Sequence, residues 1–358
     1  MFFNDEVNEK CVNFNKYEFP GTRYQGSKLK IVDWIWENIK DIEFESALDL
    51  FGGTGSVAYM LKKHGKKVIY NDILKFNSII GKALIENNSE IITDEEVEYI
   101  LTKHSCDYPS FIQDNFSNIF YLDEENQWLD YVAYNIRHLD NEYKKSMAYF
   151  ALFQACIIKR PYNLFHRANL YVRTSNVKRG FGNKSTWDKP FEKHFRAFIN
   201  QANQAIFNNN HECLSLNYDA VNFPAEEYNT DLVYIDPPYI NAKGVGTDYL
   251  DFYHFLEGMV SYDEWNELIL PKYKHKSIKG KGESPWINKK QILEEFDKIF
   301  SKFKNCTLVI SYRDNGIPTH QEIMDLLGMY KSQIIDVGKE YKYALANEKT
   351  NEMLIIAK

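Results

Sequence analysis

The sequence predicts an α/β fold in which a doubly wound sheet carries an inserted helical subdomain. Short runs of β-branched and aromatic residues alternate with segments of helical periodicity, as expected for strands joined by helices that cover both faces of a sheet. The alternation stops between about residues 88 and 210, where helical patterns and polar loops occur without a convincing core strand. We therefore interpret this interval as an insertion into the sheet.

The order of the elements indicates the domain organisation. Strands are predicted at residues 47–51, 67–71, 212–216, 232–235, 307–312, 332–337 and 353–357. Helices are predicted at residues 28–40, 55–64, 74–87, 126–138 and 289–303. We assign residues 1–87 and 211–358 to the sheet domain, residues 88–210 to the helical insertion, and residues 241–288 to a second, smaller loop insertion.

The composition is that of an ordinary globular protein, with 358 residues of which 44% are hydrophobic and 26% charged. The most apolar stretch, residues 149–158, is far shorter than the roughly 20 residues of a transmembrane helix, and no signal peptide is recognisable. The five cysteines are scattered and the nine histidines form no close pair, so neither disulfides nor a local metal site is predicted. We expect a monomeric cytoplasmic protein without a metal and away from membranes.

The basic residues are distributed unevenly in a chain whose net charge is −7. Residues 158–196 contain ten Lys or Arg and two acidic residues, and residues 271–290 contain seven lysines and one glutamate. An acidic body with two basic segments can bind a polyanion locally. Two solvated surface segments would explain the same charge pattern equally well.

The first chemical motif is a glycine-rich turn between the first predicted strand and the following helix. Gly53, Gly55 and Ala58 have the GxGxxA spacing of a nucleotide-binding turn, in which glycine permits a tight bend and a close approach of the ligand. Asp72 ends the second strand, where an acidic residue binds ribose hydroxyls. An ordinary β–α turn is the alternative. The motif favours a nucleoside cofactor without separating a nicotinamide cofactor from S-adenosylmethionine.

The second motif, Asp236-Pro237-Pro238-Tyr239, follows an apolar strand. Two prolines cannot continue a sheet ladder, so they form a rigid loop at the carboxyl edge of the strand, where α/β sites lie. A carboxylate and a fixed backbone carbonyl can hold both hydrogens of a flat exocyclic amine. They also stabilise the positive charge that grows on nitrogen as it attacks a methyl donor. The tyrosine offers a face on which a base can stack. A plain proline turn is the alternative interpretation.

A third motif, Arg23-Tyr24-Gln-Gly-Ser-Lys28, precedes the first predicted helix. Its Gly-Ser pair fits a turn followed by an N-cap. Lys28 can reach a carboxylate, for instance that of a bound methionine moiety, although a simple helix cap explains the pattern as well.

In this combination and order, the motifs resemble the alpha group of adenine-N6 DNA methyltransferases, the Dam-like class. Residues 311–316 and 349–356 also resemble the later strand and final hairpin of that group, so the resemblance covers nearly the whole chain. It implies a Rossmann-like sheet of the S-adenosylmethionine-dependent methyltransferases with an inserted helical target-recognition subdomain.

The resemblance also implies roles for individual residues. The positions implied to bind S-adenosylmethionine are Tyr24, Lys28, Asp49, Phe51, Gly53, Gly55, Asp72 and Asp219. Among them, Tyr24 and Lys28 would flank the methionine end, Asp72 would bind the ribose, and Asp219 would bind the adenine of the cofactor. The positions implied to hold the target adenine are Asp236, Pro237, Pro238 and Tyr239.

The predicted DNA-recognition segment is residues 160–173, in the basic part of the helical insertion. Arginine and asparagine suit guanine and adenine edges, lysine and arginine also hold phosphates, and aromatic side chains can wedge into a stack from which a base has been flipped out. The candidate contacts are Arg160, Asn163, His166, Arg167, Asn169, Arg173, Lys178 and Arg179. A surface helix hairpin is the alternative. The lysine-rich loop 272–281 is a further candidate for phosphate contact, or else a plain flexible loop.

We therefore expect a sequence-specific adenine-N6 methyltransferase that uses S-adenosylmethionine and flips its target base out of double-stranded DNA. A role in a restriction-modification system, beside a separately encoded restriction endonuclease, is the expected setting. Amino-group methylation of cytosine or RNA and a catalytically silent DNA-binding subunit remain alternatives. A nicotinamide dehydrogenase would leave the second motif unexplained. A C5-cytosine enzyme would need a nucleophilic cysteine, typically after proline, and the sequence has no Pro-Cys pair.

Overall fold

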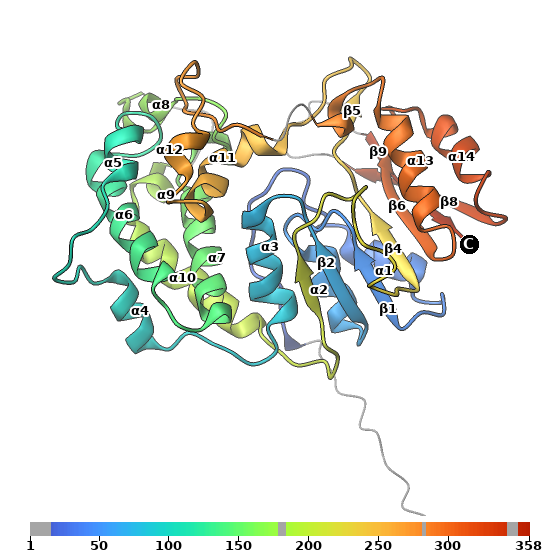
Figure 1. The fold of residues 1–358 in the computed structure, drawn as a ribbon, viewed down its shortest axis with the longest axis horizontal. Helices are drawn as coiled ribbons and strands as arrows, with labels where there is room; N and C mark the ends of the chain where they lie inside the picture. The colour runs from blue at the N-terminus through green and yellow to red at the C-terminus, as the bar shows by residue number, and fades with distance from the viewer. Residues whose placement is uncertain (1–15, 178–183, 281–283, 342–349) are drawn as a thin grey trace, which may run out of the picture.

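The computed structural model describes residues 16–177, 184–280, 284–341 and 350–358, and a seven-stranded sheet forms its centre (Figure 1). The strand order is β3-β2-β1-β4-β6-β9-β8. The strands are β1 Ser46–Asp49, β2 Lys67–Asn71, β3 Leu214–Leu216, β4 Leu232–Ile235, β6 Thr307–Arg313, β8 Ile334–Tyr341 and β9 Thr350–Ala357. All neighbouring pairs are parallel except those of β9, which runs antiparallel to β6 and to β8. The predicted mixed α/β fold is confirmed.

Helices cover both faces of this sheet because the inner strands are apolar on both sides. Val68 and Tyr234 belong to one buried cluster, whereas their neighbours Ile69 and Val233 belong to the other. The first cluster includes residues of α1 (Val32–Ile39), α2 (Ser56–Lys63) and α3 (Lys75–Gly81). Helix α3 continues as a short π-helix at Lys82–Glu86. The second cluster takes α13 (Ile292–Lys302) and α14 (His320–Leu327).

The helical insertion lies beside the sheet, on the α3 side in Figure 1. Its elements are α4 Asp94–Leu101, α5 Phe111–Phe116, α6 Asp123–Arg137, α7 Glu142–Ile158, the 3-10 turn Pro161–Asn163, α8 Leu170–Thr174, α9 Lys184–Asp188 and α10 Phe191–Ala205. Helix α7 is the central one, because its residues from Ser146 to Ile157 are all buried. The apolar core of this insertion is continuous with the core beneath α3.

The second predicted insertion packs onto the first. It contains α11 (Tyr249–Val260), α12 (Trp265–Leu268) and a 3-10 turn at Pro285–Ile287, and it follows the short strand β5 (Ile240–Asn241), which pairs with β7 (Gly316–Ile317). The ring of Phe255 in α11 lies 5.0 Å from that of Phe116 and 5.2 Å from that of Phe165. Sequence spacing predicted two separate insertions, whereas aromatic packing joins α11 and α12 to the helical subdomain.

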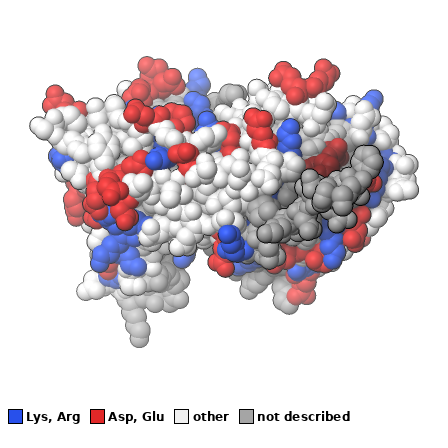
Figure 2. Space-filling view, turned by 90° about the horizontal axis from the view of Figure 1, so that it is seen from below, with Lys and Arg blue, Asp and Glu red and all other residues white. Residues whose placement is uncertain are grey.

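Neither the described helices nor the surface charge in Figure 2 has an extreme character. No helix in the described ranges is long and apolar enough to span a membrane. Figure 2, a view from below, shows a broad uncharged band with basic and acidic side chains interspersed around it. On that face, the described lysines and arginines do not form one continuous basic surface.

Candidate active site

Three acidic side chains come together at the carboxyl edge of the sheet. Asp49 ends β1, Asp72 follows β2, and Asp236 follows β4. These strands are parallel neighbours, so their carboxyl ends meet at one place. Burial, followed by the charges of Asp236 and Asp72, raises the pKa of Asp49 to about 8. The sequence predicted all three carboxylates as site residues, and the fold gathers them.

The glycine-rich turn after β1 has the shape that its sequence predicts. Gly53 and Gly55 have positive φ angles of 51° and 78°, which glycine adopts without a steric penalty. The Gly53 N–H donates to Asp72 Oδ2 at 2.9 Å, and the Leu74 N–H donates to Asp72 Oδ1 at 2.8 Å. Asp72 therefore ties the glycine turn to the start of α3. Phe51 lies edge-on to Trp286, with ring centres 5.0 Å apart, and bounds the turn on its other side.

Asp49 is the carboxylate best suited to a cationic ligand. It is buried, and its Oδ2 accepts a hydrogen bond from the Ala58 N–H at 3.2 Å. Its Oδ1 is buried without a hydrogen-bond partner among the described residues, which is an expensive state for a carboxylate oxygen. A ligand with an ammonium group, such as the methionine end of S-adenosylmethionine, would relieve that cost. The residues present therefore fit this cofactor.

The raised pKa of Asp49 predicts a pH-dependent stability. An unfolded aspartate titrates near pH 3.9, so between about pH 4 and 8 the folded state retains a proton that the unfolded state has released. The free energy of unfolding then falls as pH rises through that window. Asp49→Asn is expected to remove this fall and to exceed the parent in stability by on the order of 3 kcal/mol near pH 8, and by less near pH 5. Urea unfolding at both pH values measures the difference, and parallel pH profiles would contradict it.

Asp236 lies in a buried polar cluster that also includes Lys28, Tyr239 and Glu352. Lys28 Nζ donates to Asp236 Oδ1 at 2.9 Å and to the Tyr239 hydroxyl at 2.9 Å. The Tyr239 hydroxyl donates to the same Asp236 oxygen at 2.5 Å. Burial raises the pKa of Asp236, while the Lys28 ammonium opposes that shift. The Asp-Pro-Pro-Tyr turn thus holds its carboxylate and its ring in fixed relation, because Lys28 bridges both.

Glu352 is a member of this cluster that the sequence did not predict. It is fully buried on β9, and its Oε1 lies 3.1 Å from Lys28 Nζ and accepts from Ser311 Oγ at 2.6 Å. Lys28 was predicted beside the methionine end of the cofactor, and here it contacts the two acidic side chains. The signal available in the sequence was weak, because Glu352 follows the polar residues Thr350 and Asn351 and directly precedes the apolar run of β9.

Tyr24 is fixed by aromatic stacking from the second insertion. Its ring stacks on that of Tyr253 with centres 4.5 Å apart and on that of Tyr249 with centres 5.6 Å apart. Its hydroxyl accepts from Asn77 Nδ2 at 3.2 Å. An added Cβ at Gly26 would lie 2.5 Å from the Tyr249 hydroxyl, so this glycine permits the close approach. The start of α11 therefore contacts the segment that carries Tyr24 and Lys28.

Asp219 lies in the loop between β3 and β4. Its Oδ1 accepts from the Val221 N–H at 2.9 Å and from the Asn222 N–H at 3.3 Å. The neighbouring Tyr218 N–H donates to Asn71 Oδ1 at 2.9 Å, which brings this loop to the end of β2. The loop therefore borders the same edge of the sheet as Asp72.

The predicted DNA contact Arg160 is buried inside the helical subdomain. Only 1% of its surface is exposed. Its guanidinium donates to the carbonyl oxygens of Phe120 and Leu164, each at 3.2 Å, and to that of Arg167 at 3.0 Å. It also donates to Asn169 Oδ1 at 2.5 Å and lies 4.3 Å from the Phe120 ring centre. The prediction that Arg160 contacts DNA is therefore corrected: its donors hold the turn that follows α7.

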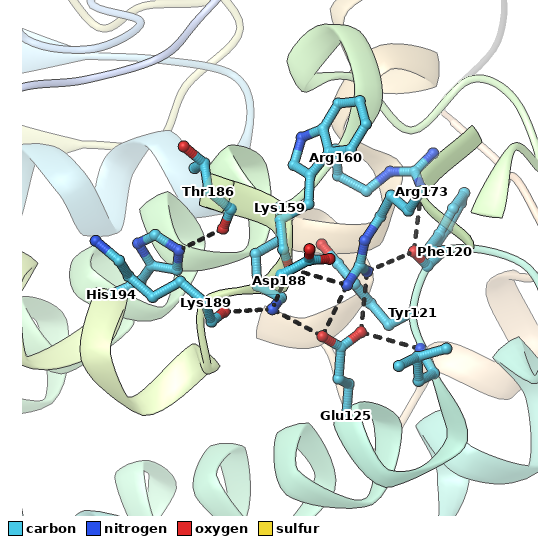
Figure 3. A network of polar contacts seen from close by, with 12 residues as sticks. Phe120, Tyr121, Glu125, Lys159, Arg160, Arg173, Thr186, Asp188, Lys189 and His194 are labelled. Carbon is cyan, nitrogen blue, oxygen red and sulfur yellow. Dashed lines mark hydrogen bonds and ion pairs between the residues drawn. The ribbon is translucent and has the colours of Figure 1, made fainter. Parts of the chain in front are cut away.

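Arg173 is the second predicted contact that turns inward, as Figure 3 shows. Its two terminal nitrogens donate to the two oxygens of Glu125 at 2.9 and 2.8 Å, and the residue is 6% exposed. Lys159 Nζ shares the same carboxylate at 2.8 Å. Burial alone would raise the pKa of Glu125, but Arg173 and Lys159 outweigh it and keep that pKa below its usual range. Arg173 is thus a structural ion-pair partner, which also corrects its prediction as a DNA contact.

The remaining predicted contacts differ in exposure. Arg167 is exposed, Asn163 and His166 are half-buried, and Asn169 is buried as the acceptor for Arg160. Lys178 and Arg179 lie outside the described residues. The segment also exposes Tyr162 and Tyr171, at 48% and 68%. Arg160 and Arg173 therefore anchor a segment whose exposed side chains lie between them.

The mostly parallel sheet, the glycine turn and the acidic edge together form a Rossmann-like fold with a site suited to a nucleoside cofactor, as in S-adenosylmethionine-dependent methyltransferases. The sequence matches the D12 class N6 adenine-specific DNA methyltransferase family over residues 24–308. The type II methyltransferase M2.HphI of Haemophilus parahaemolyticus is 29% identical over 344 residues, covering 94% of this chain and 96% of that protein. The chain belongs to the D12 class of N6 adenine-specific DNA methyltransferases.

Two further relatives differ in how much of their own length is matched. The type II methyltransferase M.FokI of Planomicrobium okeanokoites is 27% identical over 330 residues, covering 85% of this chain and 46% of that protein. The type II methyltransferase M.CviAII of Paramecium bursaria Chlorella virus 1 is 23% identical over 327 residues, covering 86% and 88% respectively. The chain is therefore similar to about half of M.FokI and to most of M.CviAII.

Proposed function

We propose that this chain methylates the N6 amine of adenine at a specific sequence in double-stranded DNA, with S-adenosylmethionine as the methyl donor. The observation that carries the proposal is the meeting of the Asp236 carboxylate with the glycine turn and Asp49 at one sheet edge. A methyl acceptor and a nucleoside cofactor bound there would face each other across a short distance. Such placement converts a bimolecular reaction into one between two held partners.

The Asp-Pro-Pro-Tyr turn is proposed to hold the target adenine. Asp236 would accept a hydrogen bond from the amino group, and a backbone carbonyl of the rigid Pro237-Pro238 segment would accept a second one. Both acceptors stabilise the positive charge that develops on nitrogen in the transition state. The Lys28 and Tyr239 donors both use Asp236 Oδ1, so an amine can approach Oδ2 without displacing either. The Tyr239 ring would stack on the extruded base.

S-adenosylmethionine would supply an electrophilic methyl group, which its positively charged sulfur releases readily. In this chain, Asp49 would bind the ammonium group of the cofactor's methionine moiety. Phe51, Gly53 and Gly55 would line the cofactor-binding site. Asp72 would bind the ribose, and Asp219 would bind the adenine of the cofactor. Tyr24 lies beside this edge through its contact with α3. Lys28 is proposed to position the Asp236 carboxylate and the Tyr239 ring through its hydrogen bonds to both.

The DNA would have to release its target base from the stack, at a cost of a few kcal/mol. Exposed groups of the recognition segment, including Arg167, Asn163 and His166, are proposed to contact the duplex around that base. The matched relatives carry the names of type II methyltransferases. We therefore propose that this monomer serves a restriction-modification system whose endonuclease is a separate chain.

The proposal is tested by transfer of labelled methyl from S-adenosylmethionine to unmethylated genomic DNA, followed by mapping of the modified bases. The expected result is N6-methyladenine at one recurring short motif. Methylcytosine would retain the amine chemistry and overturn the base assignment. Transfer to RNA alone would overturn the substrate. Cofactor binding with no transfer to either nucleic acid would favour a catalytically silent DNA-binding subunit.

A further inference from the structure

We propose that the hairpin formed by residues 269–279, here called the lysine hairpin, clamps the phosphate backbone of DNA beside the active site. This inference rests on the proposed function and assigns a contact surface outside the recognition segment. The hairpin connects α12 to the 3-10 turn at Pro285–Ile287. Figure 1 shows it in orange, extending upward from α12 near α11.

The lysine hairpin has a buried base and a charged tip. Ile269 and Ile278 bridge each other at the base and pack against the main hydrophobic core. The Leu270 N–H donates to the Ser277 carbonyl at 2.7 Å, and the Lys279 N–H donates to the Leu268 carbonyl at 2.7 Å. The lysines of the hairpin are Lys272, Lys274, Lys276 and Lys279, of which all but Lys276 are exposed. A rooted hairpin can therefore present its charges in a fixed direction.

Residues 269–279 of the hairpin include four lysines and no acidic residue. None of the four lysines forms an ion pair with an acidic residue in the described ranges, whereas Lys144, Lys145 and Lys298 elsewhere do. The ammonium groups of these lysines repel one another, so the hairpin is a local positive patch in a chain of net charge −7. A polyanion with evenly spaced charges complements such a tip, and duplex DNA carries one phosphate per strand about every 3.4 Å.

Helix α11 places the hairpin with respect to the site. Asp251 Oδ1 accepts from Ser277 Oγ at 3.1 Å and lies 3.3 Å from His275 Nε2, so the hairpin is held on the first turn of α11. Two residues earlier, the Tyr249 ring stacks on Tyr24. The start of α11 thus contacts the hairpin and the segment that leads to Lys28.

The recognition segment contacts the same helix. The Phe165 N–H donates to the Phe252 carbonyl at 2.9 Å, and the His166 ring lies 5.1 Å from the Phe252 ring. Burial and the neighbouring charge of Arg167 lower the pKa of His166, while the charge of Asp251 opposes that shift. One helix therefore carries the recognition segment, the lysine hairpin and a wall of the active site. A duplex whose base enters the site would meet both basic segments.

The test is the salt dependence of DNA binding by the triple variant Lys272→Gln, Lys274→Gln and Lys279→Gln. For each phosphate that the variant no longer neutralises, the slope of log K against log salt is expected to flatten by about 0.9. That slope corresponds to roughly eightfold weaker binding per phosphate near 0.1 M salt. Fluorescence anisotropy with a labelled duplex measures the slope.

The matched control is the variant Lys63→Gln, Lys67→Gln and Lys304→Gln. It removes the same charge from the sheet edge opposite Asp236, where Lys63 ends α2, Lys67 begins β2 and Lys304 precedes β6. The hairpin's Lys→Arg triple variant is expected to retain the parental slope, because arginine also pairs with phosphate. Equal weakening in both glutamine variants, or no weakening in either, would overturn the phosphate clamp while leaving the methyltransferase proposal intact. A change of slope for duplex RNA only would also overturn it. A parent that binds no DNA would overturn both proposals.

Discussion

Asp236→Ala is expected to lower kcat for methyl transfer by at least roughly 100-fold, because it removes the acceptor that faces the growing charge on nitrogen. Asp236→Asn keeps an acceptor oxygen without the charge, so its rate is expected to lie between those of the parent and the alanine variant. The fold is expected to survive in both, since Lys28 retains Glu352 as an ion-pair partner. Single-turnover transfer from labelled S-adenosylmethionine measures the effect.

The control for this experiment is Asp325→Asn, which removes a carboxylate of α14 that accepts from Gln321 and is not part of the Lys28 cluster. Its transfer rate is expected to equal that of the parent. Calorimetry of S-adenosylmethionine binding provides the second readout, because Asp236 is proposed to hold the base and Asp49 the cofactor. Asp236→Ala is therefore expected to bind the cofactor within severalfold of the parent. An Asp236→Ala enzyme with the parental kcat would contradict the proposed role of Asp236 as the acceptor for the target amine.

The sheet was predictable because its strands are apolar on both faces. The runs at Lys67–Asn71 and Leu232–Ile235 are short, rich in β-branched or aromatic residues, and bounded by polar residues, so their ends were predicted to the residue. Asp49, Asp72 and Asp236 each end or follow such a run. Once the strands are parallel neighbours, the meeting of these carboxylates requires only the rule that sites lie at the carboxyl edge.

Contacts made by distant segments were not predictable in this way. Glu352 reaches Lys28 only because β9 inserts antiparallel between β6 and β8, and nothing local in the sequence specifies that order. The packing of α11 against the recognition segment depends on aromatic side chains such as Phe255, and such spacing occurs in any buried helix. Local patterns thus predict elements, whereas the partners of a buried charge depend on topology.

The recognition segment shows the limit of charge as a guide. Arginines interleaved with aromatic residues are typical of nucleic-acid contacts, and the same pattern builds buried cation–π and carbonyl contacts. Arg160 and Arg167 are seven residues apart, yet the first is buried and the second exposed. The difference arises because Arg160 follows α7, the most buried helix of the helical insertion, whereas Arg167 lies on the turn that Arg160 holds.

Arg160→Ala is expected to destabilise the helical subdomain by about 3–5 kcal/mol, through unsatisfied buried acceptors and lost packing, which is a large share of the stability of an ordinary domain. The substitution leaves the carbonyls of Phe120 and Leu164 without their donor and opens a cavity beneath the Phe120 ring. The free energy of unfolding of Arg160→Lys is expected to lie between those of the parent and the alanine variant. One ammonium group cannot reach all the acceptors that the planar guanidinium reaches. Urea unfolding measures both.

Arg167→Ala is the matched control, because it removes the same side chain from an exposed position of the same turn. Its free energy of unfolding is expected to stay within about 0.5 kcal/mol of the parent, while its DNA affinity falls. The two arginines would then have opposite signatures, Arg160 in stability and Arg167 in binding. A stable Arg160→Ala protein with reduced DNA affinity would reverse the assignment. It would mean that the segment opens on DNA and releases the guanidinium that the free protein keeps buried.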